Sequence, residues 1–187
     1  MKNKGTNIKR WVEQRGQIFL KEIGVKKGQT ILDFGCGEGH YSIPAAKIVG
    51  DKGKVYALDK DINSLNVLKN IMQQNAISNI EIINEDSRVP LENESVDIAL
   101  CYDVIHYEKN RKIIYNEVYR LLKPTGFLSV YPKHCKEDQP LMELANINLK
   151  SIVNEINEAG FILEHKFSKW LLHNDYYNEG YILNFRR

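Results

Sequence analysis

The chain has 187 residues, of which 43% are hydrophobic and 27% charged, and its formal net charge is +2. This length and composition are ordinary for one globular domain, so fibrous, low-complexity and disordered chains are excluded. No apolar run approaches the roughly 18 residues of a membrane-spanning helix, and no secretory signal is expected. Three widely spaced cysteines argue against a disulfide framework. We therefore expect a single domain over residues 1–187 in a reducing, cytoplasmic setting, without membrane insertion.

The first expected element is a helix near the N-terminus, interrupted at Arg15 and weakened by Gly16. Its apolar residues gather near one helical face: Ile8, Trp11, Val12, Phe19 and Ile23. Residues 1–29 carry eight Lys and Arg against two Glu, which can attract acidic ligands or simply form a solvated surface. We expect residues 1–25 to pack on the rest of the domain, to cap a ligand site, or to do both.

Strand and helix signals alternate from residue 30 onward. Short apolar runs predict buried strands at Thr30–Phe34, Lys54–Asp59, Asn79–Asn84, Val96–Tyr102 and Phe127–Tyr131. Apolar residues at helical spacing predict helices over 39–49, 62–75, 109–122 and 148–158. This alternation is typical of an α/β fold with a mostly parallel sheet and helices on both faces. Two last strands, 161–167 and 181–185, are expected to form an antiparallel hairpin near the sheet edge, joined by a loop over 168–180.

The loop after the first strand is rich in glycine and reads Asp33-Phe34-Gly35-Cys36-Gly37-Glu38-Gly39-His40. Glycines at alternating positions let a ligand lie against the backbone, and the following helix points its free N–H groups toward that ligand. Dinucleotide-binding loops have the spacing G-x-G-x-x-G/A, and here His40 stands where the third glycine would be. A carboxylate at Asp33 would repel a pyrophosphate and attract a cation. A nicotinamide-dependent oxidoreductase is therefore disfavoured.

Acidic residues also follow the next two strands. Asp59 stands twenty residues past Gly39, where a carboxylate can accept hydrogen bonds from both hydroxyls of an adenosine ribose. The alternative role for Asp59 is that of a residue at the start of the next helix. Asp86, beside Ser87, could accept from an adenine amino group or could be an ordinary turn residue. The order of these residues on consecutive strand ends favours a nucleoside site.

Five segments carry a family resemblance: Ile31–Gly39, Val55–Asp59, Glu85–Ser87, Val96–Leu100 and Arg120–Gly126. Over residues 28–132 the chain resembles the class I S-adenosylmethionine-dependent methyltransferases, and it looks most similar to the broad group that includes quinone-biosynthesis C-methyltransferases. The resemblance implies a three-layer, Rossmann-like methyltransferase fold. Its seven-stranded, mostly parallel sheet would have an antiparallel last strand inserted between strands five and six. Because that group shares a fold only, the resemblance does not identify a substrate.

The resemblance also implies a site for the methionine part of S-adenosylmethionine. It places Asp33, Gly35 and Gly37 along this part of the cofactor, with Cys36 as a small side chain that fits between the two glycines. Tyr41 could lie over the methionine part or could belong to the core.

For the rest of the cofactor, the resemblance assigns Asp59 to the ribose and Asp86 and Ser87 to the adenine. Lys60 also belongs to the expected cofactor site, although the family commonly has an apolar residue there. The backbone near Cys101 would approach the sulfonium.

The chemistry of methyl transfer suggests candidate residues on the acceptor side. Holding a nucleophile and a methyl group in line can contribute as much as roughly 7–11 kcal/mol. The acceptor must also lose a proton, and His106 after the fourth strand is the candidate base, or else a residue that only shapes the pocket wall. Tyr102, Tyr107 and His134 could contact the substrate or pack. The sequence lacks H-x-x-x-H and C-x-x-C pairs, so no metal is expected.

The sequence therefore predicts an enzyme that transfers a methyl group from S-adenosylmethionine to a small-molecule acceptor. RNA or protein acceptors remain open because of the basic N-terminal segment, and so does a non-catalytic S-adenosylmethionine-binding module. An arsenite acceptor would need clustered thiolates, for which Cys101 and Cys135 alone are weak support. The oligomeric state is left open.

Overall fold

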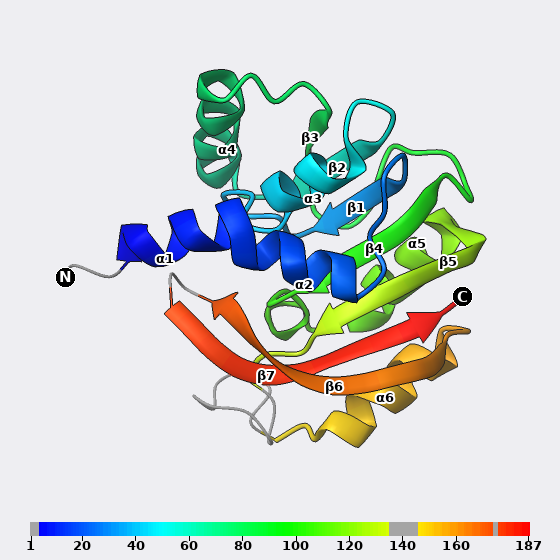
Figure 1. The fold of residues 1–187 in the computed structure, drawn as a ribbon. Helices are drawn as coiled ribbons and strands as arrows, with labels where there is room; N and C mark the ends of the chain where they lie inside the picture. Colours follow the sequence, from blue (N-terminus) through cyan, green and yellow to red (C-terminus); the bar gives the residue numbers. More distant parts are fainter. Residues whose placement is uncertain (1–3, 135–145, 174–175) are drawn as a thin grey trace.

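The computed structural model describes residues 4–134, 146–173 and 176–187, and a seven-stranded sheet runs through its centre (Figure 1). The strands are β1 (Thr30–Phe34), β2 (Lys54–Asp59), β3 (Ile80–Asn84), β4 (Val96–Tyr102), β5 (Leu122–Tyr131), β6 (Ile162–His173) and β7 (Tyr176–Arg186). Their spatial order is β3-β2-β1-β4-β5-β7-β6. Strands β1 to β5 are parallel, whereas β7 is antiparallel to both β5 and β6. The antiparallel last strand between strands five and six is thus confirmed.

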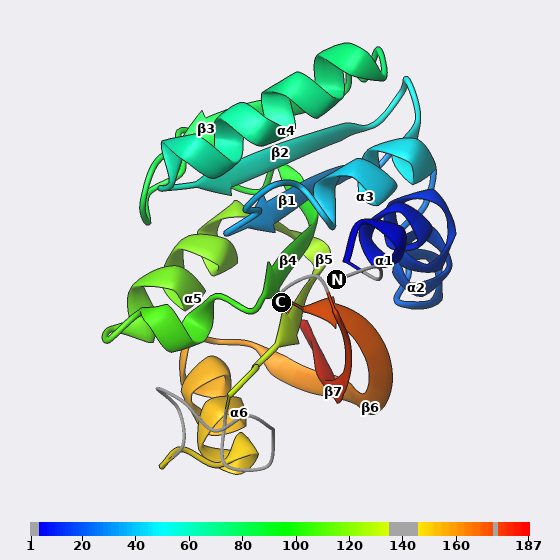
Figure 2. The same cartoon turned by 90° about the vertical axis from the view of Figure 1, so that its left-hand side faces the viewer.

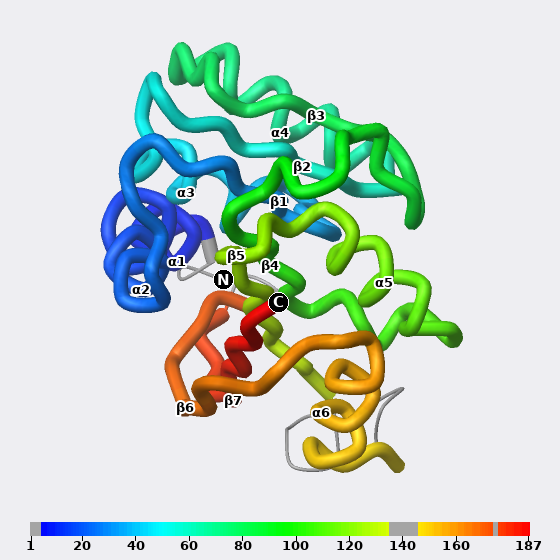
Figure 3. The backbone as a smooth tube through the Cα atoms, turned by 90° about the vertical axis from the view of Figure 1, so that its right-hand side faces the viewer, coloured from blue at the N-terminus to red at the C-terminus, as the bar shows by residue number. Residues whose placement is uncertain are grey.

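Helices cover both faces of this sheet, which gives the expected three layers (Figures 2 and 3). One apolar core lies beneath α1 (Lys4–Arg10), the π-helical η1 (Trp11–Arg15), α2 (Gly16–Glu22), α3 (Ser42–Val49) and α4 (Ile62–Gln74). A second core lies beneath α5 (Arg111–Leu121) and α6 (Leu149–Glu158) on the opposite face. Apolar positions at helical spacing account for this arrangement, because each helix buries one stripe against the sheet. Among the described helices, none has both the length and the apolar character required to cross a membrane.

The N-terminal helical segment continues through Arg15 and Gly16, so the predicted interruption is wrong. The helix widens to π geometry over Trp11–Arg15 instead of ending there. Trp11 is buried in this turn, and its indole Nε1–H donates to the His40 carbonyl oxygen at 3.0 Å. Burial of the apolar face therefore outweighs the low helix propensity of glycine.

Two predicted connections are also wrong. Strand β5 begins at Leu122, directly after α5, and not at Phe127 as expected, so Pro124 and Gly126 lie within the strand. A register shift in the β4–β5 pairing between Val96 and Ile98 accommodates this segment. The expected loop over 168–180 largely belongs to the β6–β7 hairpin, whose strands mix exposed polar residues with buried apolar ones such as Leu171 and Leu172 and so lack the continuous apolar run of a core strand. This longer hairpin carries His173 at the end of β6.

Candidate functional site

A cavity of about 840 Å³ lies at the carboxyl ends of the parallel strands. The strand order reverses between β1 and β4, and this switch point is where open α/β sheets bind ligands. The volume is within the range of small-molecule pockets, which is about 300–1,000 Å³. The cavity wall comprises residues of the glycine loop, the ends of β2 and β3, the segment after β4, the end of β6 and Ile8 of α1.

The glycine loop presents its backbone to the cavity. The N–H groups of Gly35 and Cys36 donate to the Leu58 carbonyl oxygen at 2.8 and 2.9 Å, which ties the loop to β2. Gly35 and Gly37 have φ angles of +74° and +52°. A Cβ on Gly35 would collide with Val104, whereas a Cβ on Gly37 would meet no atom within 4 Å. The loop is thus close-packed at Gly35 and faces open space at Gly37.

Asp59 lies at the end of β2 and connects the loop to the next helix. Its Oδ2 accepts from the Gly37 N–H at 2.8 Å, and its Oδ1 accepts from the Asp61 N–H at 2.9 Å. The side chain that caps α4 is Asp61, which accepts from the Asn63 N–H at 3.0 Å. Each carboxylate oxygen of Asp59 retains acceptor capacity for a further donor. Asp59 can therefore hold the loop and bind ribose hydroxyls at the same time.

The outer wall beside Asp59 is charged. Lys60, Asp86 and Ser87 all line the cavity, and Lys60 Nζ lies 3.5 Å from Asp86 Oδ1. Both charged side chains are largely exposed, so this ion pair contributes little stability and opens readily. An ion pair thus occupies the wall where the resemblance led us to expect an apolar residue.

Two predicted cofactor residues, Asp33 and Cys101, do not line the cavity. Asp33 is buried at the end of β1 and accepts from the Ser42 hydroxyl at 2.5 Å. Burial raises the pKa of the Asp33 carboxyl to about 7, and the nearby Asp59 charge acts in the same direction. Burial also raises the pKa of the Cys101 thiol to about 12. Their roles toward a cofactor stay predictions, while Cys36 does line the cavity.

Tyrosines form much of the wall toward β4. Tyr41 and Tyr102 both line the cavity, with ring centroids 4.7 Å apart in an edge-to-face contact. The Tyr41 hydroxyl donates to the Leu172 carbonyl oxygen at 3.0 Å, and the Tyr102 hydroxyl lies 2.7 Å from Ser129 Oγ in a hydrogen bond. Burial raises the pKa of both hydroxyls, so both stay protonated at neutral pH. These two rings pack in the core and face the cavity, whereas Tyr107 is 65% exposed and also lines it.

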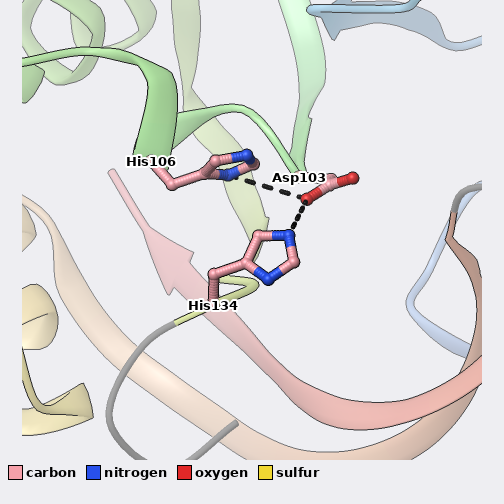
Figure 4. A group of neighbouring side chains, drawn as sticks. All are labelled: Asp103, His106 and His134. Atoms are coloured by element: carbon pink, nitrogen blue, oxygen red, sulfur yellow. Dashed lines mark ion pairs between the residues drawn. The ribbon is translucent and has the colours of Figure 1, made fainter. Parts of the chain in front are cut away.

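Four polar side chains meet beyond β4, and we refer to Asp103, His106, His134 and His173 as the histidine cluster. Asp103 follows β4, His106 belongs to η2 (Ile105–Tyr107), His134 lies beyond β5, and His173 ends β6. Asp103 Oδ1 lies 3.6 Å from His106 Nδ1 and 3.8 Å from His134 Nε2 (Figure 4). Asp103 Oδ2 lies 2.5 Å from His173 Nδ1. All three imidazoles are buried.

The cluster meets the cavity through two of its members. Asp103 and His173 line the cavity, whereas His106 and His134 lie behind them and do not. The predicted base and substrate-contact roles of His106 and His134 therefore stay predictions. Sequence reasoning missed Asp103, although it directly follows a strand, which is the signal used for Asp59 and Asp86. It also missed His173, which no local pattern separates from the expected loop.

The sequence of the chain is similar to known methyltransferases. Residues 25–175 match a family model described as a methyltransferase domain. A demethylmenaquinone methyltransferase of Oceanobacillus iheyensis is 31% identical over 108 residues, which cover 57% of this chain and 45% of that protein. A probable cobalt-precorrin-6B C(15)-methyltransferase of Saccharolobus solfataricus is 32% identical over 88 residues, or 46% of this chain and 44% of that protein. The matches thus span a little under half the length of these relatives.

Solved structures share the fold over nearly the whole chain. A SAM-dependent methyltransferase from Aquifex aeolicus aligns with a TM-score of 0.75 at 24% identity, covering 94% of this chain and 90% of that one. A putative methyltransferase from Bacillus halodurans aligns with a TM-score of 0.72 at 20% identity, covering 91% and 97%. With the family match over residues 25–175, the chain belongs to the methyltransferase-domain family, and it shares the fold of these solved methyltransferase structures.

Proposed function

We propose that this protein transfers a methyl group from S-adenosylmethionine to a small-molecule acceptor. The main support is that one cavity has the glycine loop and Asp59 on one side and two members of the histidine cluster, Asp103 and His173, on the other. The names of two relatives state small-molecule substrates, demethylmenaquinone and cobalt-precorrin-6B, which favours the same class of acceptor here.

The residues on the β1–β3 side, which we call the cofactor half, fit S-adenosylmethionine. When bound, this cofactor supplies an electrophilic methyl group on a sulfonium cation. Open space at Gly37 leaves room for a ligand against the backbone, and Asp59 offers acceptors for ribose hydroxyls. Asp86 and Ser87 would flank the adenine, beside Lys60.

The residues on the β4–β6 side, which we call the acceptor half, combine aromatic rings with titratable groups. An acceptor N–H, O–H or C–H must lose its proton before or during transfer. We propose that the histidine cluster promotes this loss, with Asp103 and His173 facing the cavity and His106 and His134 supporting them. Tyr102 and Tyr107 would contact the acceptor.

The N-terminal segment and the cysteines support two further parts of the proposal, a cap over the site and a reducing setting. Ile8 of α1 lines the cavity, which supports a capping role for residues 1–25 in enclosing a small acceptor. Cys36 and Cys101 are free thiols, which suits the proposed reducing, cytoplasmic setting.

Calorimetry of S-adenosylmethionine binding tests the proposal. Asp59→Ala removes hydrogen bonds to a charged group worth about 1.5–3 kcal/mol each, so the loss of two weakens binding by at least about 100-fold. Gly37→Val fills the open space beside the loop and should weaken binding sharply. Asp51→Ala is the matched control, because Asp51 is exposed in the turn before β2. Unchanged affinity in both site variants would contradict the cofactor assignment.

A second measurement follows the methyl group. The protein is incubated with methyl-labelled S-adenosylmethionine and separate small-molecule, RNA and protein fractions of a cell extract. Label in the small-molecule fraction is the expected result. Label confined to RNA or protein would favour a macromolecular acceptor, and tight cofactor binding without any transfer would favour the binding module.

A further inference from the structure

We propose that a divalent transition-metal ion such as Zn²⁺ binds to Asp103, His106 and His134. The bound ion would hold a hydroxyl group of the acceptor and activate it for methyl transfer. Ion binding stands on the geometry of the three side chains, and the activation step rests on the proposed methyl transfer. No metal was expected from the sequence, because the three ligands lie on separate segments and form no local sequence motif.

The distances within the cluster are those of a ligand set. Asp103, His106 and His134 each offer one ligand atom, and these three atoms all lie within 4.8 Å of one another. The separations of 3.6 and 3.8 Å from the carboxylate oxygen are too long for hydrogen bonds. Tetrahedral zinc with bonds of about 2.0–2.2 Å places its ligand atoms about 3.3–3.6 Å apart. The two separations between the carboxylate oxygen and the imidazole nitrogens are close to this spacing, and Figure 4 shows both imidazoles turned toward that oxygen.

The carboxylate oxygen at the centre of this set is buried. Within the described ranges, no donor forms a hydrogen bond to Asp103 Oδ1. A buried carboxylate oxygen is costly unless a hydrogen bond or a cation stabilises it. The other oxygen, Oδ2, contacts His173 Nδ1 at 2.5 Å. Outer-shell contacts of this kind orient ligating carboxylates in metal sites.

The backbone holds the ligands in an unusual conformation. Asp103 and His134 have φ angles of +60° and +65°, which cost non-glycine residues free energy and often occur where side chains are aimed at a ligand. The Asp103 N–H donates to the Tyr131 carbonyl oxygen at 3.1 Å, directly beyond the β4–β5 pairing. The two left-handed residues are thus fixed on adjacent strand ends.

The donor set indicates the metal and the chemistry. Two imidazoles and one carboxylate suit Zn²⁺ or Fe²⁺, and three protein ligands leave a position for a further oxygen. Asp103 lines the cavity and the two imidazole ligands lie directly behind it, so the ion site adjoins the acceptor half, and activation requires the acceptor hydroxyl to reach past the Asp103 side chain. A coordinated hydroxyl loses its proton to water more readily because the ion lowers its pKa. Its oxygen then forms the bond to the methyl carbon as the carbon–sulfur bond breaks. The expected acceptors are therefore hydroxyl compounds such as phenols or enols.

Cobalt titration of the full chain tests the ion site. The protein is stripped with a chelator, dialysed and titrated with Co²⁺ while visible absorption is recorded. We expect saturation at one equivalent with the spectrum of a low-symmetry, four-coordinate ion. His173→Asn removes only an outer-shell contact and should weaken cobalt binding by about 10- to 100-fold. His106→Ala removes a ligand and should weaken cobalt binding by more than this. The exposed His165 on β6 provides the matched control, His165→Asn, which should bind as the wild type does.

A conservative variant gives a readout that a merely structural role would not change. His134→Cys keeps a ligand at this position, so its cobalt complex should gain a thiolate-to-metal charge-transfer band. Absence of stoichiometric binding by the wild type, wild-type affinity in His106→Ala, or absence of the new band in a folded His134→Cys protein would overturn the ion site.

Calorimetry with S-adenosylmethionine on the same metal-free samples separates this inference from the proposed function. Wild-type protein that binds the cofactor but no cobalt would overturn the ion site alone, whereas loss of cofactor binding would overturn the proposed function. The product of the labelling experiment tests the activation step, since a methyl ether is expected and an N- or C-methyl product would overturn it.

Discussion

The two halves of the cavity are built by different means. The cofactor half consists of backbone and carboxylate groups at or just beyond the ends of β1, β2 and β3, and its central contact joins Gly37 to Asp59. The acceptor half brings Asp103 together with His173, seventy residues further along the chain. Recognition through a glycine loop needs only one local turn, whereas the histidine cluster needs β4, β5 and the β6–β7 hairpin to be in place. We therefore expect substitutions to affect the two halves separately, except where the halves touch.

The largest effect is expected at Gly35, where the cofactor half packs on Val104 beside Asp103. Gly35→Ala should destabilise the fold by about 2–5 kcal/mol, which combines a left-handed backbone with a steric collision. Gly37→Ala, the matched variant in open space, should cost only about 1–2 kcal/mol. Urea unfolding measures both values, and cobalt titration shows whether the displacement of Val104 reaches the histidine cluster. Equal costs for the two variants would contradict the close packing at Gly35.

An intermediate effect is expected from the buried carboxyl of the cofactor half. Because the pKa of Asp33 is raised from 3.8 to about 7, the folded state keeps this proton between about pH 4 and pH 7, while the unfolded state releases it. Stability is therefore lost as the pH rises through this window. Asp33→Asn does not titrate and can still accept from Ser42, so its stability relative to wild type should rise by about 3 kcal/mol from pH 5 to pH 8.

Urea unfolding of both proteins at pH 5 and pH 8 measures this difference. Parallel pH profiles for Asp33→Asn and the wild type would show that Asp33 is ionised in the folded state. The buried Asp33 would then carry a negative charge toward the cofactor half at neutral pH.

The smallest effect is expected where the N-terminal helices join the hairpin. Lys169 Nζ on β6 lies 2.7 Å from Glu22 Oε2 at the end of α2, and both side chains are partly exposed. Lys169→Ala should cost less than about 1 kcal/mol and leave cofactor affinity unchanged, because exposed ion pairs are screened by solvent and salt. Thermal unfolding at low and high salt checks this, with exposed Lys150→Ala as the control. A cost above about 2 kcal/mol would mean that this pair holds the cap in place.

The chain itself determined most of the fold and one half of the cavity. Apolar runs predict all seven strands, and helical patterns between most of them predict the parallel part of the sheet. The glycine loop, Asp59 and Asp86 lie at or just beyond strand ends that meet at one edge of this sheet. Such signals are local, so neighbouring residues carry them. Boundaries were less accurate where tertiary pairing overrides local preference, as in β5 across Pro124 and in the outer half of the β6–β7 hairpin.

Only the tertiary structure decided the composition of the acceptor half. His106, His134 and His173 lie on segments far apart in the sequence, and the register of β5, β6 and β7 determines which imidazoles reach Asp103. The tertiary structure also placed Asp33 behind the cavity wall, where burial and the Ser42 hydroxyl determine its charge. The physical reason is the same in both cases. Contacts between distant side chains depend on strand register and burial, which no short stretch of sequence specifies.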